Sequence, residues 1–88
     1  MNVKYESSFE KDLRKIRDKN LLQKIKDAIN ETRQAKSAKD INSLKKLKGY
    51  EAFYRIKLGD YRIGIEIVEN EIIFTRFLHR KEVYRFFP

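Results

Sequence analysis

Residues 53–79 read FYRIKLGDYRIGIEIVENEIIFTRFLH, and this run sets the class of fold. Apolar and polar side chains alternate through residues 53–58, 61–68 and 71–78, which is the period of strands with one buried face. The pair Gly59-Asp60 has glycine first, as a type II′ hairpin turn requires, and Glu69-Asn70 is a second, weaker turn signal. The run therefore predicts a three-stranded antiparallel meander.

The residues before this meander predict a strand and two helices. Residues 3–5 are typical of a short strand, and apolar side chains recur at helical spacing through 9–16 and 21–35, on either side of a polar break. Helices with so short a link pack as an antiparallel hairpin. Residues 36–49 indicate a long connection, and 81–87 one helical turn or a tail. The order β-α-α-β-β-β predicts an α+β fold, with the hairpin on one face of an antiparallel sheet.

The composition and net charge of the chain exclude several classes of function. The chain has 88 residues, with 21 Lys and Arg against 13 Asp and Glu, for a net charge of +8. This length predicts one domain, residues 1–88. The absence of cysteine and the lone His79 exclude a disulfide scaffold, a thiolate zinc site and cysteine catalysis, so we expect no metal and no cofactor. Without an apolar run for a membrane or a signal segment, we expect a cytoplasmic protein. The charge predicts a polyanionic partner: nucleic acid, an acidic protein, or both.

Two two-residue turns would set the register of the meander. Between the first two strands, Lys57 then lies opposite Arg62, and Arg55 lies opposite Gly64. Between the second and third strands, the predicted pairs are Tyr61 with Leu78, Arg62 with Phe77 and Ile65 with Phe74. One face is apolar and lies under the helices, with Arg76 as its misfit, whose charged head reaches the edge. The opposite face carries Phe53, Arg55, Lys57, Arg62, Glu66, Ile73, Thr75, Phe77 and His79.

This second face has the character of a nucleic-acid surface. Two cations directly opposite each other repel, at a cost of some tenths of a kcal/mol, unless an anion such as phosphate neutralises them. The glycine opposite Arg55 leaves a shallow hollow for the backbone of a ligand. Phe53 and Phe77 offer stacking surfaces for bases, and Lys45 and Lys46 are further expected RNA contacts. The alternative is an ordinary solvated strand face.

Two motifs carry a resemblance to a known family. YRIKLGDYRI, residues 54–63, resembles the central hairpin of RelE-type toxins of the RelE/ParE toxin–antitoxin superfamily. LHRKEVY, residues 78–84, resembles the C-terminal motif of that family, in which a basic pair precedes Glu-Val-Tyr. The strand and helical hairpin that precede these motifs match the order of elements in the family, so the resemblance covers essentially the whole chain.

The resemblance implies an mRNA endoribonuclease that acts on messenger in the ribosomal A site. The 2′-hydroxyl attacks the adjacent phosphate without a metal, giving a 2′,3′-cyclic phosphate and a 5′-hydroxyl. By position in the motifs, the implied catalytic residues are Arg55, Lys57, Arg62, His79, Arg80 and Tyr84.

The implied roles differ among these residues. Arg55 and Lys57 would contact the scissile phosphate, and Arg62 would clamp the charge of the transition state. Arginine does not readily lose its proton, so the base would be Lys57 or His79. Arg80 would stabilise the phosphate or protonate the leaving oxygen.

Tyr84 would orient the nucleophile or stack on a base. Its alternative is an apolar plug on the core, formed with Val83, Phe86 and Phe87. For His79 the alternative is a purely structural role, and for Arg80 a surface pair with Glu82 or Glu66.

The resemblance also implies the partners. They are a small acidic antitoxin wrapped round the basic surface, and mRNA on the ribosome, with DNA contacted only through the toxin–antitoxin complex. One alternative is a ParE-like inhibitor of DNA gyrase. Another is a non-enzymatic module that binds nucleic acid or the antitoxin.

Overall fold

A five-stranded sheet organises the computed structural model, which describes all 88 residues. Its strand order is β1-β5-β4-β3-β2. Three of its strands form the expected meander, and both connecting turns contain two residues, because Leu58 pairs with Tyr61 and Val68 with Glu71. Gly59 has φ +60°, the left-handed conformation that favours glycine. The strands are β1 (Asn2–Tyr5), β2 (Leu44–Lys46), β3 (Phe53–Leu58), β4 (Tyr61–Val68) and β5 (Glu71–His79).

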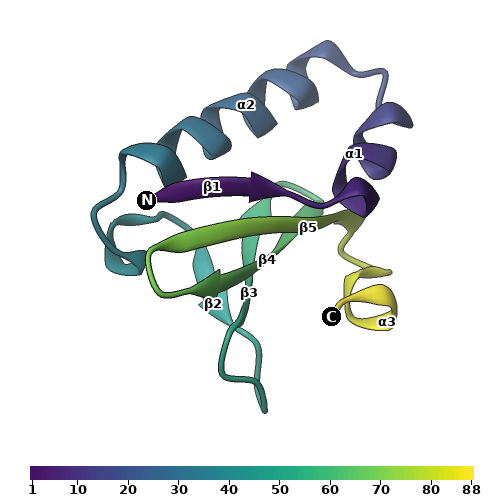
Figure 1. Cartoon of the computed structure of the whole chain (residues 1–88). Coiled ribbons are helices and arrows are strands. Elements are labelled where there is room, and N and C mark those ends of the chain that lie inside the picture. The colour runs from purple at the N-terminus through teal and green to yellow at the C-terminus, as the bar shows by residue number, and fades with distance from the viewer.

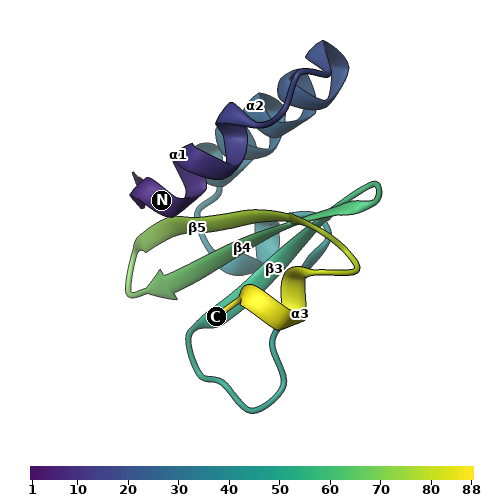
Figure 2. The same cartoon turned by 90° about the vertical axis from the view of Figure 1, so that its right-hand side faces the viewer.

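Helices cover both faces of this sheet. The helical hairpin comprises α1 (Ser7–Arg14) and α2 (Lys19–Gln34), and both helices lie on the same side of the sheet (Figure 1). The short α3 (Val83–Phe86) folds back against the other side, below the sheet in Figure 2. A 3-10 turn at Ala38–Asp40 precedes β2. None of these helices has the length and apolar character that crossing a membrane would need.

The edge strands correct two expectations from sequence. β1 runs parallel to β5, pairing Val3 with Ile72, so the sheet is mixed and not wholly antiparallel. The segment expected to be a long connection contains β2, which pairs antiparallel with β3 and places Lys45 beside Arg55. Three residues with two consecutive lysines carry too little apolar pattern to predict a strand, and lysines are common on exposed sheet edges.

A bulge shifts the register of β5. Ile65 faces Phe74 as predicted, but the pairing shifts between Gly64 and Ile65, so that Gly64 faces Arg76. Tyr61 therefore faces His79, and Arg62 faces Leu78; the predicted partners Leu78 and Phe77 were wrong by one residue. A one-residue shift sends every later side chain of the strand to the opposite face.

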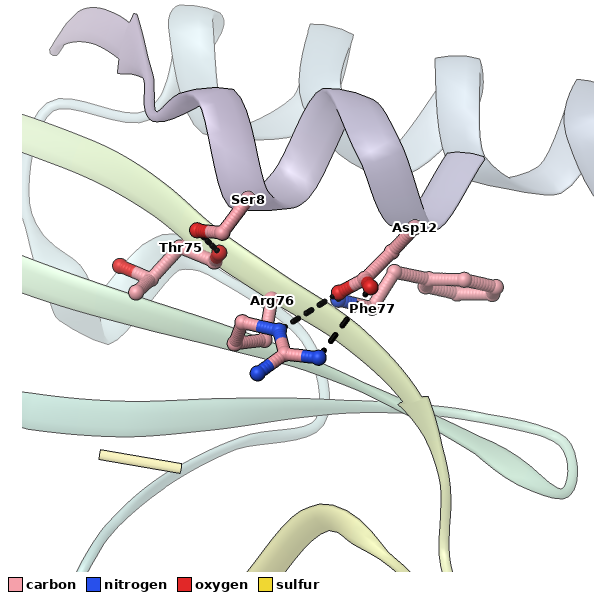
Figure 3. Close-up of polar contacts among 5 residues, drawn as sticks. All are labelled: Ser8, Asp12, Thr75, Arg76 and Phe77. Carbon is pink, nitrogen blue, oxygen red and sulfur yellow. Dashed lines mark hydrogen bonds and ion pairs between the residues drawn. The ribbon is translucent and has the colours of Figure 1, made fainter. Parts of the chain in front are cut away.

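The first helix explains why this bulge is stable. β1 covers β5 only as far as Phe74, and α1 satisfies the backbone beyond it (Figure 3). Ser8 Oγ donates to the Thr75 carbonyl at 2.6 Å. Asp12, 7% exposed, accepts from the Phe77 backbone N–H at 2.9 Å and from Arg76 Nε and Nη2 at 2.8 and 3.2 Å. Arg76 is therefore held in a partly buried ion pair and does not simply reach the edge of the sheet.

Two apolar clusters lie on opposite sides of the sheet. The main core fills the space between the sheet and the α1–α2 hairpin, and its fully buried members include Phe9, Ile63, Ile65, Ile72 and Phe74. A smaller cluster under α3 is made of Leu47, Val83 and Phe87, with Phe53 and Leu78 packed against it. This smaller cluster attaches the C-terminal helix to the face that carries Arg55.

Candidate functional site

The smaller cluster forms the floor of a basic pocket. The pocket has a volume of about 470 Å³ and lies between β2, the loop after it, β3 and α3. Leu47, Phe87 and Pro88 supply its apolar surface. Four cationic side chains and two tyrosines line the rest, with no Asp or Glu side chain among them. One of these cations is already paired, because Lys46 Nζ lies 3.5 Å from Glu51 Oε2. The polar lining is Lys45, Lys46, Lys48, Tyr50, Arg55 and Tyr84.

Gly64 allows α3 to sit where it does. A Cβ atom at this position would lie 2.7 Å from ring carbons of Phe87, closer than any side chain tolerates. The hollow predicted opposite Arg55 for the backbone of a ligand is therefore filled by the Phe87 ring, which is 2% exposed. The pocket opens beside this ring.

Arg55 is the most constrained cation of the pocket. Its Nη1 donates to the Ser43 carbonyl at 3.1 Å, while its Nε is buried and has no acceptor. An unsatisfied buried donor costs about 1–3 kcal/mol, and more when charged. Lys45 lies directly across from Arg55 on β2, so like charges are also adjacent. The repulsion between Arg55 and Lys45 would fall if an anion entered the pocket.

The two tyrosines reach the pocket from different elements. Tyr84 on α3 is 66% exposed, and Tyr50 on the loop between β2 and β3 is 46% exposed. The predicted plug on α3 is correct for Val83 and Phe87, which are buried, and wrong for Tyr84 and Phe86, which are exposed. Tyr84 is thereby free to contact a ligand.

A second group of predicted residues gathers at the β3–β4 turn, outside the pocket. Arg62 Nη1 donates to the carbonyls of Gly59 and Tyr61 at 2.9 and 2.8 Å. Arg80 Nε lies 3.9 Å from Asp60 Oδ1, and this exposed pair replaces the predicted alternatives with Glu82 or Glu66. Lys57 pairs with Arg62 as predicted and shares the face of Arg55. These cations extend the positive surface from the pocket toward the turn.

The aromatic side chains expected on the basic face lie elsewhere. Because of the bulge, Phe77 points into the main core at 3% exposure, where its ring stacks on Tyr61 with centroids 4.9 Å apart. Phe53 is on the predicted face, but its ring packs edge-on against Phe87 at 5.7 Å, inside the smaller cluster. Neither ring is presented as a free stacking surface for a base.

His79 is also displaced to the other side. It pairs with Tyr61, which packs on the main core, so His79 lies on the helix side of the sheet. Its ring meets the Tyr61 ring edge-on at 5.4 Å, and its Nδ1 accepts a 3.2 Å hydrogen bond from the Lys81 backbone. The predicted placement of His79 on the basic face is therefore wrong, because the bulge in β5 moves His79 to the helix side as it moves Phe77.

Two pocket residues were not singled out from sequence. Lys48 and Tyr50 belong to the run KKLKGY, residues 45–50, in which lysines alternate irregularly with apolar and aromatic residues. Basic residues interleaved with an aromatic one are a signal for nucleic-acid binding. This signal lay in a segment taken for a plain connection. No group of three or more His, Cys, Asp or Glu side chains gathers in the chain in a way that could hold a metal ion.

Comparison with known proteins identifies the family. The family model described as the ParE toxin of the type II toxin–antitoxin system parDE matches residues 3–84. Toxin RelE3 of Methanocaldococcus jannaschii is 43% identical over 89 residues, with both chains covered completely. The chain belongs to the RelE/ParE toxin family. The predicted resemblance is thus confirmed.

Solved structures of RelE proteins have the same fold. The toxin of the RelB–RelE antitoxin–toxin complex from Methanococcus jannaschii has a TM-score of 0.80 and 41% identity, over 97% of this chain and 99% of that one. In the archaeal RelE–RelB complex from Pyrococcus horikoshii OT3, the matching chain has a TM-score of 0.73 at 20% identity, over 90% and 93%. The α+β architecture is therefore that of the RelE/ParE family.

Both family motifs border the basic face in this RelE/ParE toxin. Residues 54–63 form β3, the turn and the start of β4, and they carry Arg55. Residues 78–84 leave β5, pass the turn at Arg80 and enter α3, where Tyr84 meets the pocket of Arg55. Two motifs far apart in sequence thus converge on one pocket.

Proposed function

We propose that this toxin is an endoribonuclease that cleaves mRNA and so inhibits translation. The observation that carries the proposal is the pocket that joins Arg55 and Tyr84: four cations, no Asp or Glu side chain, and Arg55 directly across from the like charge of Lys45. Such a site attracts a phosphodiester and stabilises the additional negative charge of its transition state.

The reaction follows from the nucleophile that RNA itself contains. The 2′-oxygen attacks the adjacent phosphorus while its proton passes to a base, and the bond from phosphorus to the 5′-oxygen breaks. The 5′-oxygen then takes a proton, leaving a 2′,3′-cyclic phosphate and a 5′-hydroxyl. In this proposal Arg55 and the pocket lysines stabilise the pentacovalent phosphorane, with Lys57 and Arg62 holding the RNA backbone beyond the pocket.

Proton transfer falls to groups of the basic face. His79 lies on the other side of the sheet, so it is an unsuitable base for a substrate bound in the pocket. In the pocket, the Tyr84 hydroxyl or a lysine ammonium group can donate a proton to the leaving 5′-oxygen, and a lysine in its neutral amine form can accept the proton of the 2′-hydroxyl. Arg80, exposed at the turn, would contribute charge rather than a proton.

The partners are proposed by analogy with relatives. The RelE chains from Methanococcus jannaschii and Pyrococcus horikoshii were each solved in complex with RelB. We propose that a cognate acidic antitoxin covers the basic face of this chain, as its net charge of +8 would favour. The mRNA would be presented on the ribosome, in the A site.

Inhibition of DNA gyrase is the second candidate, because the matching family model is described for ParE toxins. An inhibitor of gyrase would arrest replication before translation and would not need Arg55 or Tyr84 to meet in a pocket. Incorporation of labelled amino acids and of thymidine after induction separates the two: we expect amino-acid incorporation to fall first.

The deciding experiment is cleavage of mRNA on programmed ribosomes. Wild type should yield products with 2′,3′-cyclic phosphate and 5′-hydroxyl ends. Arg55→Ala should be slower by about 100-fold, as expected for loss of one contact to the transition-state charge. Lys11→Ala, on the exposed outer surface of α1, serves as the matched loss of one cation. Absence of cleavage by folded wild type freed of antitoxin would reject the proposal.

A further inference from the structure

Tyr50 is an exposed aromatic residue whose ring has one aromatic neighbour, Phe53. Its ring belongs to neither apolar cluster, although it lines the basic pocket. Tyr50 is 46% exposed and lies among lysines, and aromatic residues combined with cations are a feature of sites that bind single-stranded nucleic acid.

The loop nevertheless holds Tyr50 in place. Gly49 adopts φ +87°, which turns the chain sharply just before Tyr50. The Tyr50 backbone N–H donates to the Leu47 carbonyl at 3.3 Å, and its ring meets Phe53 edge-on with centroids 5.6 Å apart. Phe53 is itself anchored on Phe87, so the position of the Tyr50 ring depends on the smaller cluster. Contacts within the chain therefore position the Tyr50 ring.

The pocket combines two exposed tyrosines with cations. Tyr50 comes from the loop after β2 and Tyr84 from α3, with Lys48 and Arg55 lining the same cavity of about 470 Å³. That volume lies in the range of roughly 300–1,000 Å³ typical of small-ligand sites, sufficient for one nucleotide. Single-stranded nucleic acids are bound by this pairing of aromatic faces for bases with cations for the backbone.

We propose that Tyr50 and Tyr84 stack on one nucleobase of single-stranded RNA, while Lys48 contacts a neighbouring phosphate. Tyr50 is thus a substrate-binding residue from the β2–β3 loop. The proposal rests on the proposed function, because it places the RNA of that reaction in the same pocket. It adds that one base next to the scissile phosphate is held by stacking on the loop.

An acidic peptide is a less suitable occupant of this pocket. Carboxylates would pair with the lysines and Arg55, but they would leave both tyrosine faces without a partner. Base stacking uses the tyrosines and the cations together, so the composition of the pocket favours RNA.

The test uses the full chain, freed of antitoxin, and a short single-stranded RNA that cannot be cleaved. The RNA carries 2′-O-methyl groups and a 2-aminopurine placed at each position in turn, and stacking quenches the fluorescence of this base. Wild type should quench at one position. Tyr50→Ala should abolish this quenching and weaken binding about ten-fold, as expected for loss of one stacked aromatic ring. Tyr50→Phe should retain both.

Phe86→Ala is the matched control, because Phe86 is an exposed aromatic residue of α3 that does not line the pocket. It should behave as wild type. Quenching that survives Tyr50→Ala, or that never occurs with wild type, would overturn the inference, as would equal loss in the control.

The inference and the proposed function fail in different ways. Because the methylated RNA cannot react, quenching reports binding alone. A protein that quenches the base through Tyr50 and cleaves nothing on ribosomes would reject the nuclease and keep the stacking site. A protein that cleaves mRNA equally well as wild type and as Tyr50→Ala, without quenching, would keep the nuclease and reject the stacking site.

Discussion

At the scale of a single residue, the buried carboxylate of Asp12 holds together two elements that lie far apart in the sequence. It joins α1 to β5 by accepting from Arg76 and from the backbone N–H of Phe77. The hydrogen bond to Asp12 raises the pKa of the Arg76 guanidinium above its ordinary value. Burial of Arg76 lowers this pKa by a smaller amount, and the negative charge of Asp12 raises it further.

Removing Asp12 should destabilise the protein severely. Asp12→Ala leaves a partly buried guanidinium and a strand N–H without acceptors, and breaking a buried pair costs about 3–5 kcal/mol. Urea unfolding followed by circular dichroism measures the change. Asp27→Ala is the control: Asp27 is exposed and accepts only from Gln23, so the loss should stay within about 0.5 kcal/mol. Equal losses in the two variants would contradict this view of Asp12.

The pH dependence of the pair follows from the direction of the shift at Arg76. A raised pKa in the folded state stabilises the protein at every pH below the pKa of the unfolded chain, and this contribution disappears only as pH rises through the folded value. We therefore expect the stability that Arg76 contributes to stay constant between about pH 7 and 10, since arginine remains charged throughout that range. The urea midpoints of wild type and Arg76→Met should differ by the same amount at pH 7 and at pH 10. A difference between the two proteins that shrinks toward pH 10 would contradict this expectation.

Gly64 decides where α3 can lie. In Gly64→Ala the added methyl would lie 2.7 Å from the Phe87 ring, so the ring and the helix must move. Such overpacking costs about 1–3 kcal/mol, and we expect cleavage to fall more than stability because the pocket of Arg55 and Tyr84 is disrupted. Combining Gly64→Ala with Phe87→Leu should restore part of the activity. Full activity of Gly64→Ala alone would show that α3 does not shape the site.

The bulge in β5 is the decisive feature at the scale of an element. It turns Phe77 into the main core and sends Leu78 to the smaller cluster. Successive side chains of a strand point to opposite faces, so a register without the bulge would send both Phe77 and Leu78 to the wrong face.

Deleting Thr75 should therefore prevent folding to the native state. Without the extra residue, either Phe77 and His79 or the residues before the bulge must face the wrong side. Thr75→Val is the matched control, since it keeps the bulge and removes a hydroxyl that bonds only to the nearby Ile73 carbonyl at 3.2 Å. Near-ultraviolet circular dichroism and urea unfolding should show a native-like Thr75→Val and no cooperative transition for the deletion. A cooperative deletion variant would mean that the strand accommodates either register.

At the scale of the whole molecule, the charge is organised rather than uniform. The net charge of +8 includes a pocket with four cations and no Asp or Glu side chain, and further cations at the β3–β4 turn. Clustering of one sign in a concave site focuses the potential and attracts polyanions.

The number of cations that meet RNA should be readable from salt dependence. Four pocket cations in contact with single-stranded phosphates predict a slope of about −3 in a plot of log affinity against log salt. Lys45→Gln with Lys48→Gln should reduce the magnitude of this slope by about 1.4. Lys11→Gln with Lys15→Gln, at α1 and just after it, removes the same charge and should leave the slope near its original value. A smaller slope in the Lys11→Gln, Lys15→Gln variant, with an unchanged slope in the Lys45→Gln, Lys48→Gln variant, would place the RNA on the helices.

The sequence by itself determined the features that depend on neighbouring residues. Alternation defined β3, β4 and β5, turn chemistry defined the Gly59-Asp60 hairpin, and these together paired Lys57 with Arg62 and Arg55 with Gly64 as observed. The two motifs indicated the family. Of the candidate pocket, Lys45, Lys46, Arg55 and Tyr84 were named from sequence, but nothing local indicated that they would meet.

Tertiary structure decided the rest, because the contacts involved join distant segments. The bulge that moves Phe77 and His79 to the helix side is held by Asp12, which lies 64 residues before Arg76. The pocket exists because Phe87 fits against Gly64, and Tyr50 enters it because β2 pairs with β3. Period and turn signals extend over a few residues only, so they could not report which residues satisfy an open strand edge or fill a space across the sheet.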